Sequence, residues 1–279
     1  MDVSTAKIVV FGLFVSVGLL EALRSGFLSK DGQKPGDLAA DGTAYVVLSF
    51  LVVPGVFVFV NAMLGIFAPE ASGAWAHWPF AVQLLMLAIF DDMMQYWWHR
   101  ASHTFPWLYG LHRGHHEAGY MSVRIVYRNN MFYYALMPSI WFSAALVYMG
   151  FGWSYALFLI VKQTVIFGAH SDLKWDRFLY RNAWLSPVAW VVERVISTPS
   201  THFMHHGKHL ADGITHYKGN FGNLFFFWDV LFGTAKITRQ YPEEFGTENL
   251  APVSWQRQIF SPRGAGVEPE TPASLQPAE

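Results

Sequence analysis

Residues 79–103 read PFAVQLLMLAIFDDMMQYWWHRASH, and the rest of the chain can be interpreted outward from them. The apolar run 79–98 is long enough to cross a bilayer, since a membrane-spanning helix needs about 20 residues. The run is followed by His99 and His103, which are four positions apart and therefore share one face of a helix. We predict a membrane helix that carries metal-binding side chains at its end.

Other apolar runs surround this one, and together they predict about five spans. The four further runs are 8–24, 44–68, 131–149 and 153–169. The last two are expected to form a tight hairpin around Gly150 and Gly152. Pro54-Gly55 predicts a kink in the second run, because proline removes a helical hydrogen bond.

The composition agrees with a membrane protein. The chain is 53% hydrophobic and only 14% charged, against about 25% charged residues in an average soluble domain. A net charge of −1 offers no electrostatic surface for nucleic acid. Cysteine is absent, which excludes disulfides and thiolate metal sites.

The basic residues predict the orientation, because cytoplasmic loops are rich in Lys and Arg. The loop 25–43 is basic, the loop 69–78 has no Lys or Arg, and basic residues follow the third and fifth runs. We therefore place the N-terminus outside and the histidines and C-terminal part in the cytoplasm. The first run has no cleavage site after it and is read as a retained span.

The expected fold is an all-α membrane bundle with a cytosolic helical cap that carries a histidine-rich two-metal site. The cap, 171–260, holds apolar patches too short to cross a membrane, which suggests interfacial helices. We expect one domain over 1–260. The segment 261–279 is rich in Pro, Ala and Glu and is expected to be a disordered tail.

Nine of the 12 histidines are candidate metal ligands. Three boxes and one separate residue supply them: His99 and His103; His112, His115 and His116; His202, His205 and His206; and His170. On a helix each box directs its imidazoles toward one volume. Nine exceed the three or four protein ligands of one ion, so two ions are expected.

Each box alone is a weak signal, since histidine pairs also arise on wet surfaces. Three boxes in so apolar a chain favour a metal site, because buried and unpaired imidazole has a desolvation cost. His77 and His209 are interpreted as surface residues. His216 stays open, as a further ligand or as a loop residue.

Asp92 lies on a helical stripe with Gln95, His99 and His103. Ionisable residues at membrane depth usually have a partner inside the protein. We expect Asp92 to accept a hydrogen bond from the outer N–H of a ligating histidine. The alternative is a structural contact between helices.

Several other sites are excluded by their missing motifs. HHEAGY has Tyr120 where the zinc-protease motif needs a second histidine. The chain also lacks a phosphate-binding loop, a dinucleotide turn and a G-x-S-x-G elbow. Any electrons must therefore come from a partner protein.

The boxes resemble a known family. The stretches DMMQYWWHRASH, LHRGHH, GAHSDL, STPSTHFMHHG and GNFGNLFFFWDVLFGT, within about 85–235, are similar to the fatty acid hydroxylase superfamily. That superfamily includes sterol desaturases, sterol methyl oxidases, fatty acid 2-hydroxylases and alkylglycerol monooxygenases. The bacterial hydroxylases and the alkylglycerol monooxygenases look most similar.

The resemblance implies a membrane-bound non-haem diiron oxygenase that uses O2 to hydroxylate a C–H bond of a fatty acyl chain, a sterol or an ether lipid. The nine histidines would bind two iron ions, although zinc could replace iron in a purified form. Electrons would come from a cytochrome b5-like protein or from a ferredoxin and its reductase. No residue is assigned as an acid or base.

The resemblance also extends to residues around the ligands. Asn220 and Gly222 match the family's N-Y-G motif, with Phe221 in place of its tyrosine. Asn220, like Asp92, is expected to support the ligands. The family usually has an aspartate two residues before this asparagine, where this chain has Lys218.

Two alternative functions remain. A desaturase would use the same site, because both reactions begin with removal of a hydrogen atom. A histidine-rich membrane metal transporter would need polar residues along its path, and the second, fourth and fifth runs contain almost none. The lipid, the carbon attacked and the oligomeric state are not predicted.

Overall fold

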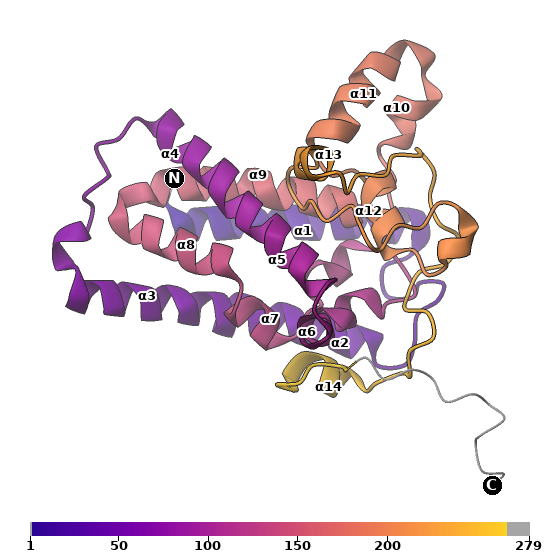
Figure 1. Ribbon diagram of the computed structural model, residues 1–279, viewed down its shortest axis with the longest axis horizontal. Helices are drawn as coiled ribbons and strands as arrows, with labels where there is room; N and C mark the ends of the chain where they lie inside the picture. The colour runs from indigo at the N-terminus through magenta and orange to yellow at the C-terminus, as the bar shows by residue number, and fades with distance from the viewer. Residues whose placement is uncertain (1, 267–279) are drawn as a thin grey trace, which may run out of the picture.

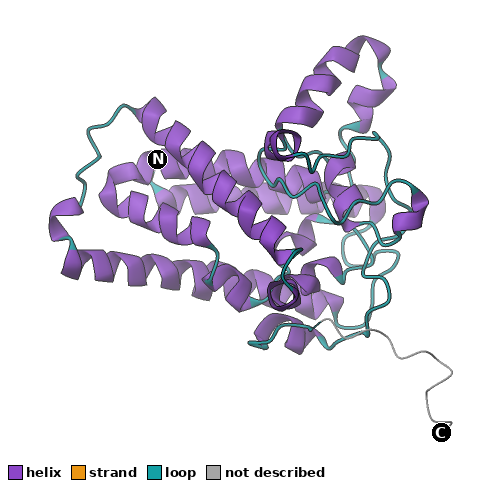
Figure 2. Cartoon of the chain, in the orientation of Figure 1, coloured by secondary structure: helices purple, strands orange, loops and turns teal. Residues whose placement is uncertain are grey.

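The computed structural model describes residues 2–266, and within that range the chain is helical. No strand occurs among these residues, which contain only two isolated β-bridges. Figure 2 shows helices joined by loops. The predicted all-α fold is therefore confirmed.

The helices are numbered as in Figure 1. The α-helices are α1 (Val3–Ser25), α2 (Asp37–Val46), α3 (Val53–Phe67), α4 (Phe80–Met86), α5 (Asp92–Ser102), α6 (Pro106–His116), α7 (Met131–Ala135), α8 (Pro138–Leu146), α9 (Gly152–His170), α10 (Arg177–Arg181), α11 (Ser186–Val195), α12 (Pro199–His206), α13 (Phe227–Phe232) and α14 (Trp255–Phe260). The π-helical segments are η1 (Val47–Val52), η3 (Leu87–Asp91) and η5 (Val147–Phe151). Short 3-10 turns are η2 (Pro69–Ala71), η4 (Val123–Tyr127), η6 (Ala183–Leu185) and η7 (Leu210–Asp212).

The long helices form a bundle whose members run along one another. α1 packs beside α9, and α3 packs beside α8 (Figure 1). The end of α5, the end of α9 and the short helices α6 and α12 gather toward one end of this bundle (Figure 1). The loops and helices that follow α9 cover that end.

Within residues 2–266, three helices, rather than the expected five, are long and apolar enough to cross a membrane. They are Val3–Ser25, Asp37–Phe67 and Pro138–His170. The expected span 79–98 does form part of a continuous helix, Phe80–Ser102, but polar residues such as Asp91 and Asp92 reduce its apolar character. The expected fourth and fifth spans lie in one helical stretch with a reversal inside it.

That reversal is the predicted hairpin, and Gly150 makes it. Gly150 has φ +114°, a conformation that side chains rarely adopt. A Cβ atom there would lie 2.7 Å from the backbone nitrogen of Ala76. The close approach brings the loop before α4 onto the turn, where the Trp75 N–H also donates to the Met149 carbonyl (2.9 Å).

The helix around Pro54 is irregular, as expected, but one turn earlier than the proline. Residues Val47–Val52 are π-helical and lead into α3, in which Pro54 is the second residue. Proline has no N–H to donate to the preceding turn, so the hydrogen-bond pattern shifts there.

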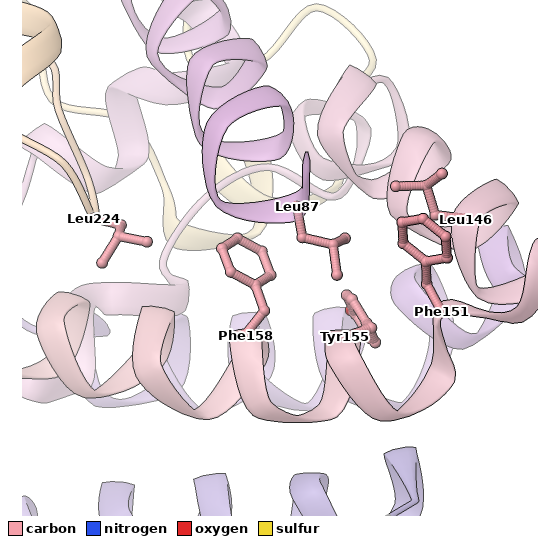
Figure 3. Packing of buried hydrophobic residues seen from close by; sticks show 6 residues of the cluster. All are labelled: Leu87, Leu146, Phe151, Tyr155, Phe158 and Leu224. Atoms are coloured by element: carbon pink, nitrogen blue, oxygen red, sulfur yellow. The ribbon is translucent and has the colours of Figure 1, made fainter. Parts of the chain in front are cut away.

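A buried apolar cluster joins the bundle to the segment after α12. Figure 3 shows Leu87 lying over Tyr155 and Phe158 of α9, with Leu224 beside them. Leu87 and Leu224 are almost completely buried. Leu224 comes from residues 207–232, which follow α12 and are called the covering segment, so the cluster holds this segment against α9.

Buried charges hold the segment after α6 in place. Glu21 of α1 accepts hydrogen bonds from Ser122 Oγ (2.6 Å) and Val123 N (3.0 Å). Arg128 pairs with Asp37 of α2 (2.8 Å). These bonds are inaccessible to water, which makes the position of residues 117–130 well defined.

The expected tail does not begin at 261. Residues 261–266 pack against α6, where the Ala265 N–H donates to the Gly110 carbonyl (2.7 Å) and Ala265 is fully buried. The small Gly110 lets the two backbones approach. The rest of the expected tail, 267–279, lies outside the described residues.

Candidate metal centre

All nine predicted histidines meet at the covered end of the bundle, in two groups. The five-histidine group contains His99, His103, His112, His116 and His205. The four-histidine group contains His115, His170, His202 and His206. Within each group the ligand atoms lie within 4.8 Å of one another, and eight of the nine residues are buried.

Local sequence explains how the short helix α12 presents its three histidines. Pro199 occupies the first position, and Thr198 and Thr201 form a reciprocal capping box. The cap fixes the start of the helix, so the turn that follows places the HFMHH box inside the site. Its histidines contact the groups formed with α5, α6 and α9.

Five histidines use the outer ring nitrogen, Nδ1, in a hydrogen bond to an oxygen. The bonds join His99 to Phe221 O (2.7 Å), His112 to Asn129 Oδ1 (2.7 Å), His115 to Ile125 O (2.9 Å), His170 to Ile166 O (2.8 Å) and His205 to Gly219 O (2.7 Å). These oxygens accept, so each Nδ1 carries the hydrogen. The inner nitrogen, Nε2, of each neutral ring then carries a lone pair that can bind a cation.

The inner nitrogens face one another at short distances. His99 Nε2 lies 3.0 Å from His205 Nε2, and His115 Nε2 lies 3.3 Å from His170 Nε2. In both pairs each Nδ1 already donates to an oxygen, so two lone pairs oppose each other. A cation between them is the arrangement that makes this contact favourable.

The spacing also fits a metal ion. An imidazole nitrogen lies about 2.0–2.1 Å from zinc, and two such ligands of one ion are then about 2.9–3.4 Å apart. The distances above fall in that range, and His202 Nε2 to His170 Nε2 is slightly shorter at 2.8 Å. Two further buried ring nitrogens, His103 Nε2 and His202 Nδ1, have no hydrogen-bond partner.

Burial keeps the imidazoles of α6 and α12 neutral. It lowers the pKa of all six histidines on these helices well below the ordinary value, and neighbouring histidines lower the pKa further. The neutral imidazole is the form that binds metals.

Asp92 does not make the expected hydrogen bond to a histidine. Its carboxylate accepts from the N–H groups of Leu224 (3.3 Å) and Phe225 (3.0 Å) and from Trp228 Nε1 (3.0 Å). Asp92 therefore binds the segment that follows α12 and no imidazole. Asp92 acts as a structural anchor, the alternative considered for it.

Asn220 likewise supports the site without touching an imidazole. It donates to the carbonyls of Thr201 (2.8 Å) and Lys236 (2.9 Å) and accepts from Lys236 N (2.7 Å). Its φ of +57° lets the chain turn between Gly219 and Phe221. The carbonyls of those two neighbours accept from His205 and His99.

His216 belongs to neither group. Its Nε2 faces the carbonyl of Thr234 (3.2 Å), so the further ligand that we considered is not supported. His77 is exposed, as expected. His209 is partly exposed and contacts Glu248 (2.9 Å) and Glu244 (3.3 Å).

Two supporting residues were missed in the sequence. Asn129 holds His112, although no histidine box lies next to it. Asp229 accepts from Phe221 N (2.8 Å), Gly222 N (2.7 Å) and Thr234 Oγ1 (2.6 Å), and so fixes the loop behind His99 and His205. Of these two residues, only Asp229 could have been predicted from the sequence, because it lies in the WDVLFGT motif.

Two cavities reach the histidines from different sides. The larger, with a volume of about 500 Å³, is lined by His99, His115 and His170 and extends between α1, η1 and α9. The smaller, about 240 Å³, reaches His103 and His116 from among the covering loops. The site is therefore accessible from the bundle interior and from the cap.

Comparisons with known proteins indicate the family of the chain. Alkylglycerol monooxygenase of Danio rerio is 27% identical over 171 residues, which make up 58% of this chain and 31% of that relative. The chain thus spans about a third of the relative's length. No solved structure matches the chain. The profile of the family "Fatty acid hydroxylase" matches residues 84–234, more than half of the 279 residues and all nine histidines, and the chain belongs to this family.

Proposed function

We propose that this protein is a membrane-bound diiron oxygenase that hydroxylates a C–H bond of a lipid with O2 and electrons from a partner. One observation carries the proposal. Two adjacent groups of neutral imidazoles lie at the end of a cavity that extends between two helices able to cross a membrane.

The nine histidines would hold two iron ions, which would supply the oxidising power to attack an unactivated C–H bond. The lone pairs that face each other support such ligation, and the family supports iron. Imidazole also binds zinc and other metals, so a purified form with zinc would fit the same residues.

The protein's own residues position the substrate and exclude water. The cavity wall contains large exposed side chains of α1 and η1: Ile8 is 72% exposed, Phe11 52% and Phe50 71%. A lipid can pass between these two helices directly from the bilayer. Tyr133 and Phe158 line the interior, where an alkyl chain replaces water.

The smaller cavity suggests where the polar reactants arrive. It is lined by Tyr109, Tyr217, Lys218 and Glu248 as well as by His103 and His116. We place this side in the cytoplasm, from the distribution of basic residues. An electron-transfer protein, cytochrome b5-like or a ferredoxin, would approach here.

Desaturation remains the second candidate, since the same hydrogen abstraction can end in an alkene. A metal transporter is disfavoured because the histidines sit at one end of the bundle rather than along a path through it. Fatty acyl chains, sterols and ether lipids are the candidate substrates, and the similarity to the Danio rerio alkylglycerol monooxygenase supports the ether lipids among them.

Comparative lipid mass spectrometry of cells with and without the protein tests the proposal. A product heavier by one oxygen indicates hydroxylation, and a product lighter by two hydrogens indicates desaturation. His115→Ala should remove the product and lower the metal content while the protein still inserts into membranes. Full activity of that variant, or metal uptake without O2 consumption, would overturn the proposal.

A further inference from the structure

The helices α10 and α11 form a hairpin that projects from the end of the bundle where the histidines gather. In Figure 1 the hairpin stands at a steep angle to the long helices α1, α3 and α9. Because α1 and the stretches that contain α3 and α9 are long and apolar enough to cross a bilayer, a hairpin at this angle lies along the bilayer surface and not through it.

One face of α11 is apolar and exposed. Trp184, in the turn η6 just before α11, is followed by Val188, Val191 and Val195 at steps of four, three and four residues, so the four side chains form one stripe. Trp184 is 75% exposed, and the three valines are also exposed. We call these four residues the apolar stripe. Contiguous exposed apolar side chains of this kind indicate an interaction surface.

The opposite face of α11 packs on the protein. Ala189 is fully buried and Glu193 almost so. Glu193 accepts hydrogen bonds from Nε (2.8 Å) and Nη2 (2.9 Å) of Arg239, whose guanidinium group lies over the ring of Tyr180 of α10 (5.4 Å to the ring centroid). The cap therefore lies behind α11, and the apolar stripe faces away from it.

The apolar surface continues toward the membrane helices. α11 packs beside α13, which carries the exposed residues Val230 and Leu231. Phe232 of α13 in turn packs against the exposed Trp97 of α5, with ring centroids 5.0 Å apart. Since α5 ends the continuous helix Phe80–Ser102, the apolar stripe is connected to the bundle and is not an isolated patch on the cap.

The residues beside the stripe suit lipid headgroups. The guanidinium group of Arg194 lies over the ring of Trp190 (4.4 Å to the ring centroid). Arg181 is exposed at the turn of the hairpin and has no ion pair among residues 2–266. The hairpin 177–195 contains three arginines and one acidic residue. Apolar residues flanked by tryptophan and arginine are typical of a helix in the membrane interface, where phosphate groups attract cations.

We propose that the α10–α11 hairpin lies in the headgroup region of the leaflet at the histidine end, with the apolar stripe in the acyl boundary and with Arg181 and Arg194 beside the phosphates. The sequence predicts interfacial helices within 171–260, and this proposal narrows the contact to one face of one hairpin. Thr198, which caps α12, follows α11 after two residues. Membrane contact of α11 would thus hold the third histidine box at a constant depth.

Single-cysteine labels measure this contact, because the chain has no cysteine of its own. Val188→Cys and Val191→Cys, each in the full-length protein, are labelled with the fluorophore NBD and placed in nanodiscs of phosphatidylcholine and phosphatidylglycerol. Quenching by lipids that carry a nitroxide at two known depths gives the depth of each label. We expect both labels about 5–10 Å into the boundary between headgroups and acyl chains, and protected from iodide in the water.

Leu210→Cys is the matched control. Leu210 is 44% exposed, close to the 48% of Val188, but it lies in η7, another part of the cap. Its label should be quenched by iodide and not by the nitroxide lipids. Equal quenching of the Leu210 and Val188 labels by these lipids would overturn the proposal, because lipid contact would then not depend on the apolar stripe.

Other results identify other occupants. Quenching of the Val188 and Val191 labels by iodide would show a free surface, and protection from both quenchers would show that a second copy or another protein covers the stripe; each result overturns the proposal. Both valines are exposed, so the variants should keep the wild-type Tm in detergent, and a lower Tm would contradict the packing described here. The depth of the labels does not depend on the reaction, so this inference can stand or fall independently of the oxygenase.

Discussion

The substitution Asp229→Asn should weaken metal binding by the five-histidine group and leave metal binding by the four-histidine group unchanged. Asp229 is fully buried, and its two oxygens accept the three hydrogen bonds described above. The change turns one oxygen into an NH2 group, which can be placed to face the Gly222 N–H but cannot accept from it. The loop that presents the carbonyls of Gly219 and Phe221 then loses part of its support.

The magnitude follows from these contacts. Losing one hydrogen bond to a charged group costs about 1.5–3 kcal/mol, and the two remaining bonds weaken because charge-assisted bonds are about twice as strong as neutral ones. Removing a buried charge offsets part of this cost. We expect the free energy of unfolding to fall by about 2–4 kcal/mol.

Metal binding should respond unequally. Gly219 O and Phe221 O accept from His205 and His99, which both belong to the five-histidine group. Loss of such support typically weakens metal binding about 10–100-fold. The four-histidine group uses Ile125 O and Ile166 O instead, so its affinity should remain.

Anaerobic metal titration of the detergent-purified variant, in competition with a chelator, measures both affinities. Asp212→Asn is the matched control, because Asp212 also accepts three hydrogen bonds, from Ile214 N, Thr215 N and Thr215 Oγ1 (each 2.7 Å), in a loop away from those carbonyls. The reasoning is refuted if Asp229→Asn weakens both groups alike, or if the control weakens the same group.

Four further experiments test other parts of the structure. His205→Ala should lower the metal content and abolish lipid oxidation, whereas the exposed His77→Ala should change neither; elemental analysis and product assays compare them. Asp92→Asn should lower the free energy of unfolding by about 1–3 kcal/mol, because its oxygens anchor the covering segment, and an unchanged Tm would contradict that. Gly150→Ala should lower the Tm, since φ is +114° and the new Cβ would contact Ala76; a wild-type Tm would show that the turn adapts. Chelation of the metal should lower the Tm of the wild-type protein, measured by thermal unfolding, because the opposed imidazole lone pairs lose their cation; an equal Tm would argue against ligation.

The histidines could be predicted because spacing within a box is local geometry. Four and three residues make neighbours on a helix, whatever the rest of the fold does. The hydrogen-bond partners of the histidines could not be predicted, because four of the five acceptors are backbone carbonyls, which any residue type provides. The exception, Asn129, reaches His112 only because the segment after α6 folds back over that helix.

The wrong predictions concern features that depend on tertiary packing and not on local sequence. The stripe that contains Asp92 indicates which face of the helix is buried but not which segment covers it, and that segment carries Trp228. His216, which the sequence left open as a ligand or a loop residue, lies near the third box in sequence, yet its ring faces the Thr234 carbonyl. The number of spans was too high, although the hairpin at Gly150 was predicted, because the run 79–98 is less apolar than its length suggests and the fourth and fifth runs form one helical stretch, Pro138–His170.

The two histidine groups share their helices. α6 supplies His112 and His116 to one group and His115 to the other, and α12 supplies His205 to one and both His202 and His206 to the other. Neither group can shift without turning a helix that also serves its neighbour. If each group held one cation, the geometry of α6 and α12 would set the separation of the two cations, and this separation would stay constant while substrates bind and leave.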